Sequence, residues 1–202
     1  MSLRLDGLGL LFAVLILAIS APVTLYAIGH RHHDRLAFRG SGLLFGLFVL
    51  SMLGVALAGD AFTFLIAWET MSLASFALVL ADHHRAEVRR AGWVYLVMTH
   101  AATACITVAF LLLARHSGSL AFDDWAAAVG SLDPASAGLI FMLGLIGFGT
   151  KAGVIPLHVW LPRAHPVAPP AVSALTSGVM IQLAVHGLVR LGSGVPGPGA
   201  PV

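Results

Sequence analysis

Long apolar runs separated by short polar stretches follow one another along most of the chain. Each run has about 20 residues, the length a helix needs to cross roughly 30 Å of hydrocarbon. Only Gly59 and Asp60 separate the second and third runs, so we expect a tight antiparallel hairpin there. The pattern predicts an all-α membrane protein in which residues 1–191 form one polytopic domain. The six predicted spans are residues 8–28, 41–59, 61–81, 91–114, 137–155 and 171–191.

The composition agrees with a membrane protein. Hydrophobic residues make up 58% of the chain and charged residues 10%, against about 25% charged in a soluble domain. The mean hydropathy is +0.94. The single cysteine, Cys105, lies in an apolar run and excludes an internal disulfide. The first apolar run continues to Ile28, longer than the ~7–15 residues of a signal-peptide core, so we interpret it as a retained span.

The loops between the predicted spans alternate in charge. The stretches 30–40 and 82–90 each carry three arginines, whereas the stretch 115–136 has one arginine and three aspartates. Arginine and lysine concentrate in cytoplasmic loops. We therefore predict that the first two loops face the cytoplasm and that the amino terminus lies outside.

A proline-rich segment separates the last two predicted spans. Residues 156–170 contain five prolines, too many for a spanning helix, yet the segment is too apolar for a free linker. Irregular backbone at membrane depth must be buried in protein or line water. We expect a re-entrant or interfacial segment packed against the helices. Residues 192–202 form a tail rich in glycine and proline.

The only lysine of the chain, Lys151, lies toward the end of the fifth apolar run. Arginine cannot practically lose its proton, whereas lysine does so readily when it is buried. Pro156 withholds an N–H group and crowds the carbonyl of Ala152, so the fifth helix is predicted to break near Gly153 and Pro156. A titratable cation beside a helix break in the membrane indicates ion handling rather than scaffolding.

Glu69 is the acidic counterpart, near the middle of the third span, with Ser72 on the same helix face. We expect Glu69 to approach Lys151 on an adjacent helix, within ion-pair or single-water distance. The pair would then switch: close together the lysine keeps its proton, and further apart it releases it. A purely structural ion pair is the alternative.

Further polar residues fall on predicted spans or beside the helix break. In the sixth span Gln182, His186 and Arg190 follow one another at i+4 spacing, which favours a hydrated path over simple contacts between helices. His100 begins a similar polar stripe on the fourth span. His158, in the proline-rich segment, is a candidate proton carrier. The proposed relay therefore comprises Glu69, His100, Lys151, His158, Gln182 and His186.

The sequence contains no pattern of a catalytic or metal centre. The loop histidines, at 30, 32, 33, 83 and 84, lack accompanying cysteines and a recurring ligand spacing, so no metal site is expected. A nucleotide-binding loop, a nucleophile triad and a redox-centre motif are also missing. We expect no cofactor and no catalytic centre in this chain.

Two motifs carry a resemblance to a known family: residues 67–75 (AWETMSLAS) and 151–162 (KAGVIPLHVWLP), continued by 172–175 (VSAL) and 177–181 (SGVMI). With these the chain resembles the proton-conducting, antiporter-like membrane subunits of respiratory complex I, Mrp-type cation/proton antiporters and group 4 membrane hydrogenases. Among them it most resembles the large membrane subunit of hydrogenase-4 and formate hydrogenlyase.

The resemblance implies roles for particular residues. The glutamate matching Glu69 pairs with the lysine matching Lys151, and protons move through half-channels as charge states alternate. Many members have a lysine at the position of Gln182, so that relay role is absent here or has moved to His186. Redox chemistry in other subunits drives the movement. The implied partners are further membrane subunits and a peripheral redox arm, in the inner membrane of a prokaryote.

The resemblance covers the first repeat of an antiporter-like subunit, because the family continues into a second, inverted repeat. The chain is thus expected to be a functional half, a split gene product or a truncated remnant. Three functions stay open. They are a proton-translocating subunit of a redox-driven complex of the NADH:quinone oxidoreductase or membrane hydrogenase type, an Mrp-type sodium/proton antiporter subunit, and a non-transporting assembly fragment.

Overall fold

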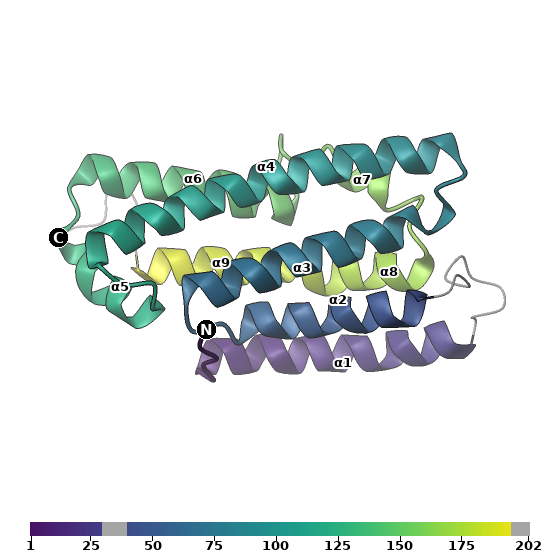
Figure 1. Cartoon of the computed structure of the whole chain (residues 1–202), viewed down its shortest axis with the longest axis horizontal. Helices are drawn as coiled ribbons and strands as arrows, with labels where there is room; N and C mark the ends of the chain where they lie inside the picture. The colour runs from purple at the N-terminus through teal and green to yellow at the C-terminus, as the bar shows by residue number, and fades with distance from the viewer. Residues whose placement is uncertain (30–39, 195–202) are drawn as a thin grey trace.

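In the computed structural model, residues 1–29 and 40–194 are described, and their regular structure is helical throughout. The predicted all-α class is confirmed. Figure 1 shows the long helices running side by side along one axis, with α4 and α6 on one side of the bundle and α1 and α2 on the other. In chain order the helices are α1 (Gly7–Gly29), α2 (Ser41–Ala56), α3 (Ala61–Val79), α4 (Ala86–Ser117), α5 (Phe122–Ala128), α6 (Pro134–Ala152), α7 (Leu161–Ala164), α8 (Pro170–Leu175) and α9 (Ile181–Gly194).

Five helical stretches of the described chain are long and apolar enough to cross a membrane: Gly7–Gly29, Ala61–Asp82, Ala86–Ser117, Pro134–Ala152 and Pro170–Gly192. The last joins α8 and α9 through a π-helical segment, Thr176–Met180. The remaining predicted span, 41–59, corresponds to α2, which has 16 residues and ends at Ala56. At 1.5 Å per residue α2 is about 24 Å long, shorter than the other five.

The early end of α2 has a structural reason. Residues after Ala56 hydrogen-bond to other segments rather than continuing the helix. Arg4 donates its N–H to the Leu57 carbonyl at 2.7 Å, and Gly59 donates to the Ser2 carbonyl at 3.0 Å. Figure 1 shows the amino terminus and α5 at the same end of the bundle. The chain therefore turns into α3 where it meets its own first residues.

The helix that carries Lys151, α6, ends at Ala152 with Gly153 as its cap, within the break predicted near Gly153 and Pro156. Gly153 has φ +77°, the left-handed conformation that ends many helices. Val154 then donates its N–H to the Gly149 carbonyl at 2.9 Å and closes the helix end. A Cβ atom on Gly153 would also lie 2.1 Å from Leu161 Cδ1, so the Leu161 side chain would have to move. Pro156 follows in the exposed turn.

The segment after the break packs on the bundle, as expected. Trp160 is fully buried and α7 lies against α4. Whether this segment enters the membrane stays a prediction. The predicted loop at 30–40, except Gly40, and residues 195–202 of the predicted tail lie outside the described residues, while α9 runs three residues past the predicted span.

Close contact between α4 and α6 holds the centre of the bundle. A Cβ atom on Gly147 would lie 2.5 Å from Ile106 Cγ1 and 2.7 Å from the Ala102 carbonyl oxygen. The glycine thus lets the backbones approach, as small residues do between membrane helices. Nearby, the rings of Phe64, Trp68, Phe110 and Phe148 pack together in stacked, tilted or edge-to-face contacts.

Candidate functional site

Lys151 lies in the last turn of α6 with no exposed surface. Its Nζ atom donates to Ser72 Oγ on α3 at 2.8 Å and lies 3.4 Å from the Tyr95 hydroxyl on α4. The ammonium also stands 5.7 Å from the centroid of the Trp68 ring and 5.3 Å from that of Tyr95. Two hydroxyls and two aromatic faces therefore surround the charge, where three helices meet.

The hydroxyl groups around Lys151 continue into a small network. Ser75 Oγ lies 2.6 Å from the Tyr95 hydroxyl, and Ser72 donates to the Trp68 carbonyl at 3.0 Å. Each hydroxyl can donate and accept at once, so it can pass a proton as well as hold one. Trp68, Ser72 and Ser75 are spaced at i, i+4 and i+7, which puts them on one face of α3.

The helix break is joined to this cluster through Trp160. Its indole Nε1 donates to the Thr150 carbonyl at 2.8 Å, and the same carbonyl accepts the Gly153 N–H at 3.2 Å at the end of α6. The Trp160 ring also packs edge-to-face on Tyr95, with centroids 5.1 Å apart. The segment after the break therefore supports both the end of α6 and the Lys151 cluster.

Glu69 does not form the expected direct ion pair with Lys151 in the part of the chain that the structure describes. Its Oε2 atom lies 3.5 Å from His100 Nε2 on α4, and its Oε1 atom is buried without a hydrogen-bond partner. At 3.6 residues per turn, Glu69 points about a quarter turn away from the Trp68–Ser72 face that holds Lys151. The sequence spacing of Glu69 and Ser72 did not reveal this offset. A bridge through one water molecule stays a prediction.

In the described part of the chain, no hydrogen bond or ion pair joins the other predicted relay residues to Lys151. His100 is exposed and contacts Glu69, and Gln182 is exposed on α9. His158 is partly buried beyond the break, with its Nδ1 atom unpartnered. His186 is fully buried and packs against Phe12 of α1, with ring centroids 4.8 Å apart. The structure thus places these residues in separate groups rather than in one continuous chain.

Tyr95 is the site residue that the sequence argument missed. It is one of only two tyrosines in the chain and lies within the fourth predicted span. A buried tyrosine hydroxyl usually finds a hydrogen-bond partner, which was the available signal. Among the described residues, no group of three or more histidine, cysteine, aspartate or glutamate side chains is arranged to hold a metal ion.

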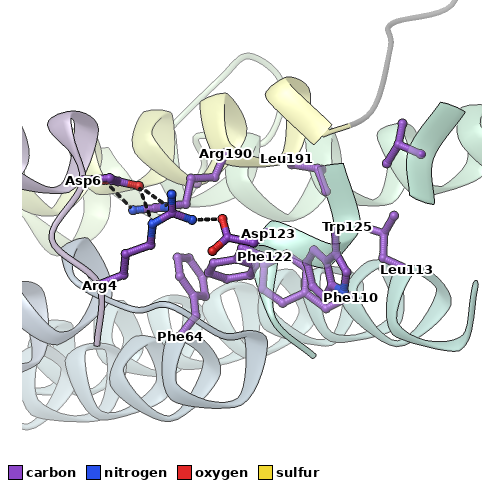
Figure 2. A pocket seen from close by; sticks show the side chains of 12 residues that line it. Arg4, Asp6, Phe64, Phe110, Leu113, Phe122, Asp123, Trp125, Arg190 and Leu191 are labelled. Atoms are coloured by element: carbon purple, nitrogen blue, oxygen red, sulfur yellow. Dashed lines mark hydrogen bonds and ion pairs between the residues drawn. The ribbon is translucent and has the colours of Figure 1, made fainter. Parts of the chain in front are cut away.

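A second polar site lies at the end of the bundle formed by the first residues, α5 and the end of α9. It surrounds a cavity of about 210 Å³. Figure 2 shows charged side chains on one side of this cavity and aromatic rings on the other. The charged residues lining it are Arg4, Asp6, Asp123 and Arg190, and the rings belong to Phe64, Phe110, Phe122 and Trp125.

Known proteins share both the sequence and the helical arrangement of this chain. Residues 58–196 match the family described as NADH:quinone oxidoreductase/Mrp antiporter, TM. The chain belongs to this family. Lys151 and Glu69 lie within the matched region, whereas Arg4 and Asp6 precede it. The family assignment made from the motifs is thereby confirmed.

Individual members of the NADH:quinone oxidoreductase/Mrp antiporter family align over most of the chain. An uncharacterized protein of Mycobacterium tuberculosis is 45% identical over 98% of the chain, and hydrogenase-4 component B of Escherichia coli is 37% identical over 95%. The chain spans 30% and 28% of their lengths. The structure of the Mrp complex from Dietzia sp. superposes with a TM-score of 0.82 and 31% identity, over 94% of this chain and 21% of that one.

Proposed function

We propose that the chain is part of a proton-translocating membrane subunit of a redox-driven complex of the NADH:quinone oxidoreductase or membrane hydrogenase type. One observation carries the proposal. The only lysine is fully buried at a helix break, and its ammonium is held by hydroxyls and rings rather than by a carboxylate. Such a lysine can release its proton without leaving an unpaired carboxylate behind. The similarity to hydrogenase-4 component B supports the choice of complex.

In this proposal, Lys151 exchanges its proton with the hydroxyl network of Ser72, Tyr95 and Ser75. The Glu69–His100 pair stores a second proton on the neighbouring face of α3, and its charge acts on Lys151 through the bundle. His158, Gln182 and His186 extend the relay beyond these groups. The proton moves when a change in one charge alters the stability of the next.

The proposal also includes partners. His100 and Gln182 are exposed on helices that the membrane would surround, where polar groups are costly. Other membrane subunits, or further helices of a longer subunit, would cover them, and a peripheral redox arm would drive the cycle. We place the chain in the inner membrane of a prokaryote with its amino terminus outside. A cysteine at position 86 should then react only with reagents that reach the cytoplasm, and labelling from outside would contradict this orientation.

The central experiment compares Lys151→Arg with Lys151→Ala in the assembled complex, reconstituted in vesicles. Arginine keeps the positive charge but holds its proton at any workable pH. If Lys151 passes protons, both variants should lose proton uptake on the order of 100-fold, the usual contribution of a positioned acid–base group, while subunit abundance is unchanged. Arg163→Lys, at an exposed position of α7, is the matched control for exchanging these two cations.

The outcome of Lys151→Arg separates the alternatives. Uptake at the native rate in this variant would reduce Lys151 to a structural charge and refute the relay. Because the chain superposes on part of the Mrp complex, the same vesicles should also be tested with an imposed sodium gradient. Sodium-coupled proton movement that needs Lys151 would favour the antiporter function. Assembly without either activity would favour a non-transporting module.

A further inference from the structure

An alternating series of charges leads from the end of the bundle to His186. Asp123 contacts Arg4, Arg4 lies 4.0 Å from Asp6, Asp6 binds Arg190, and Arg190 binds His186. The exposed fraction of the side chains falls along this series, from 69% to 43%, 25% and 11%, and His186 is completely buried. Figure 2 shows the charged members of the series, with Arg190 reaching from α9 toward Asp6. The series therefore connects the cavity with a buried imidazole.

Arg190 is the member that contacts His186. Its two terminal nitrogens bind the two oxygens of Asp6, at 2.9 and 3.1 Å. Its Nε atom donates to His186 Nε2 at 3.2 Å, and the guanidinium carbon lies 5.7 Å from the centroid of Phe122. A guanidinium held by two parallel bonds to a carboxylate has a fixed plane. Asp6 thus determines where the Nε–H group of Arg190 points.

This contact determines the hydrogen position on His186. A guanidinium nitrogen only donates, so His186 Nε2 must accept and cannot itself carry a hydrogen. The ring is then neutral, and its hydrogen is on Nδ1. That Nδ1 atom is buried and has no hydrogen-bond partner among the described residues. A buried N–H without a partner is costly and is normally paired with protein or water. His186 is therefore held in one tautomer, with Nδ1 as its donor.

We infer that the Asp6–Arg190 pair positions His186 as the neutral Nδ1–H tautomer, blocks its Nε2 atom, and so controls proton exchange between the cavity and His186. The role in transport rests on the function proposed above, whereas the tautomer does not. Asp6 and Arg190 act through His186 and are positioning residues. The charged groups that line the cavity, in the described part of the chain, are Arg4, Asp6, Asp123 and Arg190.

Asp6 is the group through which the cavity would act on this arrangement. Burial alone would raise the pKa of Asp6, but the N–H of Gly9 and the cations Arg190 and Arg4 lower it. The carboxylate therefore keeps its charge, and keeps Arg190 in place, at neutral pH. A proton on Asp6 removes one of its two acceptor positions and most of its attraction for Arg190. The Nε2 atom of His186 would then become accessible.

Nitrogen NMR of the full chain in lipid nanodiscs, with ¹⁵N-labelled histidine, tests the inference directly. The signals of His186 are identified by their loss in His186→Gln. The native chain should show only the neutral Nδ1–H form at pH 7. Arg190→Met removes the donor, so the single-tautomer signal should be lost. Exchange of the ring hydrogen with water should rise about tenfold, because a hydrogen bond to a charged group is gone.

Two further variants keep the inference falsifiable. Arg4→Met removes a cation from the same cavity without touching His186, and it should leave the His186 signals unchanged. Arg190→Lys keeps the charge near Asp6 but has no planar guanidinium held by two parallel bonds to Asp6, so the orienting contact is lost and the single tautomer should be lost as in Arg190→Met. An Nε2–H or charged His186 in the native chain would overturn the inference. So would equal effects of Arg4→Met and Arg190→Met. None of these signals depends on whether Lys151 pumps protons.

Discussion

Ser72 makes the shortest polar contact of the buried ammonium, so replacing Ser72 measures how much this hydrogen bond contributes to the stability of the chain. In Ser72→Ala, Lys151 Nζ loses its bond at 2.8 Å and keeps only the Tyr95 hydroxyl at 3.4 Å. A hydrogen bond to a charged group contributes about 1.5–3 kcal/mol. The bond from Ser72 to the Trp68 carbonyl is lost as well, but that carbonyl keeps its partner within the helix. We expect Ser72→Ala to lower the free energy of unfolding by about 1.5–3 kcal/mol.

The same change should have little effect once the charge is gone. In a Lys151→Met background, which keeps a long apolar side chain, Ser72→Ala should cost less than about 0.5 kcal/mol, so the double-mutant cycle gives a coupling energy of at least 1 kcal/mol. Ser51→Ala is the matched control. Ser51 is also buried, but its hydroxyl donates only to the Phe48 carbonyl of its own helix, so no coupling with Lys151 is expected.

The assay is reversible unfolding of the full chain in mixed micelles with increasing sodium dodecyl sulfate, followed by circular dichroism. All four combinations of the two sites are measured at the same pH. Equal costs of Ser72→Ala in the two backgrounds would refute the reasoning, because the serine would then stabilise α3 independently of the lysine. Coupling of Ser51 with Lys151 would also contradict the reasoning, because the coupling would then not come from the hydrogen bond between Ser72 and Lys151.

Two further predictions concern the helix ends. Gly153→Ala places a Cβ atom 2.1 Å from Leu161 Cδ1 at a left-handed position, so it should lower the free energy of unfolding by about 2–3 kcal/mol. Gly138→Ala, with open space around the new Cβ atom, is the control and should be neutral or slightly stabilising in the same unfolding assay. For Asp60, burial raises the pKa, but hydrogen bonds from Thr63 and Ser2 lower it to about 2. The stabilisation by Asp60 is thus complete above its ordinary pKa of 3.8 and disappears as pH falls toward 2. Asp60→Ala should lower the free energy of unfolding by about 1 kcal/mol at pH 7, and the variant and the native chain should become equally stable below pH 3. A stability difference that does not change with pH would contradict this prediction.

The sequence was sufficient for the fold because membrane helices are determined by local composition. An apolar run must satisfy its backbone within itself, so helix and approximate length follow from the residues alone. The errors occur where long-range contacts decide. The end of α2 at Ala56 depends on backbone hydrogen bonds between residues 57–59 and residues 2–4, which no local sequence pattern around residue 56 predicts. The break after Lys151, by contrast, was predicted near Gly153 and Pro156, and Gly153 has the left-handed conformation that ends α6.

The candidate site was predicted less completely than the fold. The burial of Lys151 follows from its position in an apolar run, whereas Ser72 was noted only as sharing a helix face with Glu69. The approach of Glu69 to Lys151, within ion-pair or single-water distance, stays a prediction, although no direct ion pair joins the two in the described part of the chain. The rotation of α3 instead directs Glu69 toward His100. The contact between Asp6 and Arg190 joins residues 184 positions apart, so no spacing rule could have found it.

The arrangement of the two polar clusters limits how protons can move between them. The Tyr95 hydroxyl in the Lys151 cluster contacts the sulfur of Met180 at 3.7 Å, and His186 lies six residues further along the same helix. Six residues of helix span about 9 Å, three times the reach of a hydrogen bond. The side chains of Leu183 and Ala184 between them are apolar and fully buried. A relay through both clusters would therefore have to pass these apolar side chains, which would require water between them. Under the proposed function, the Arg190 contact that keeps His186 neutral, with its Nε2 atom blocked, would limit a proton leak between such water and the cavity.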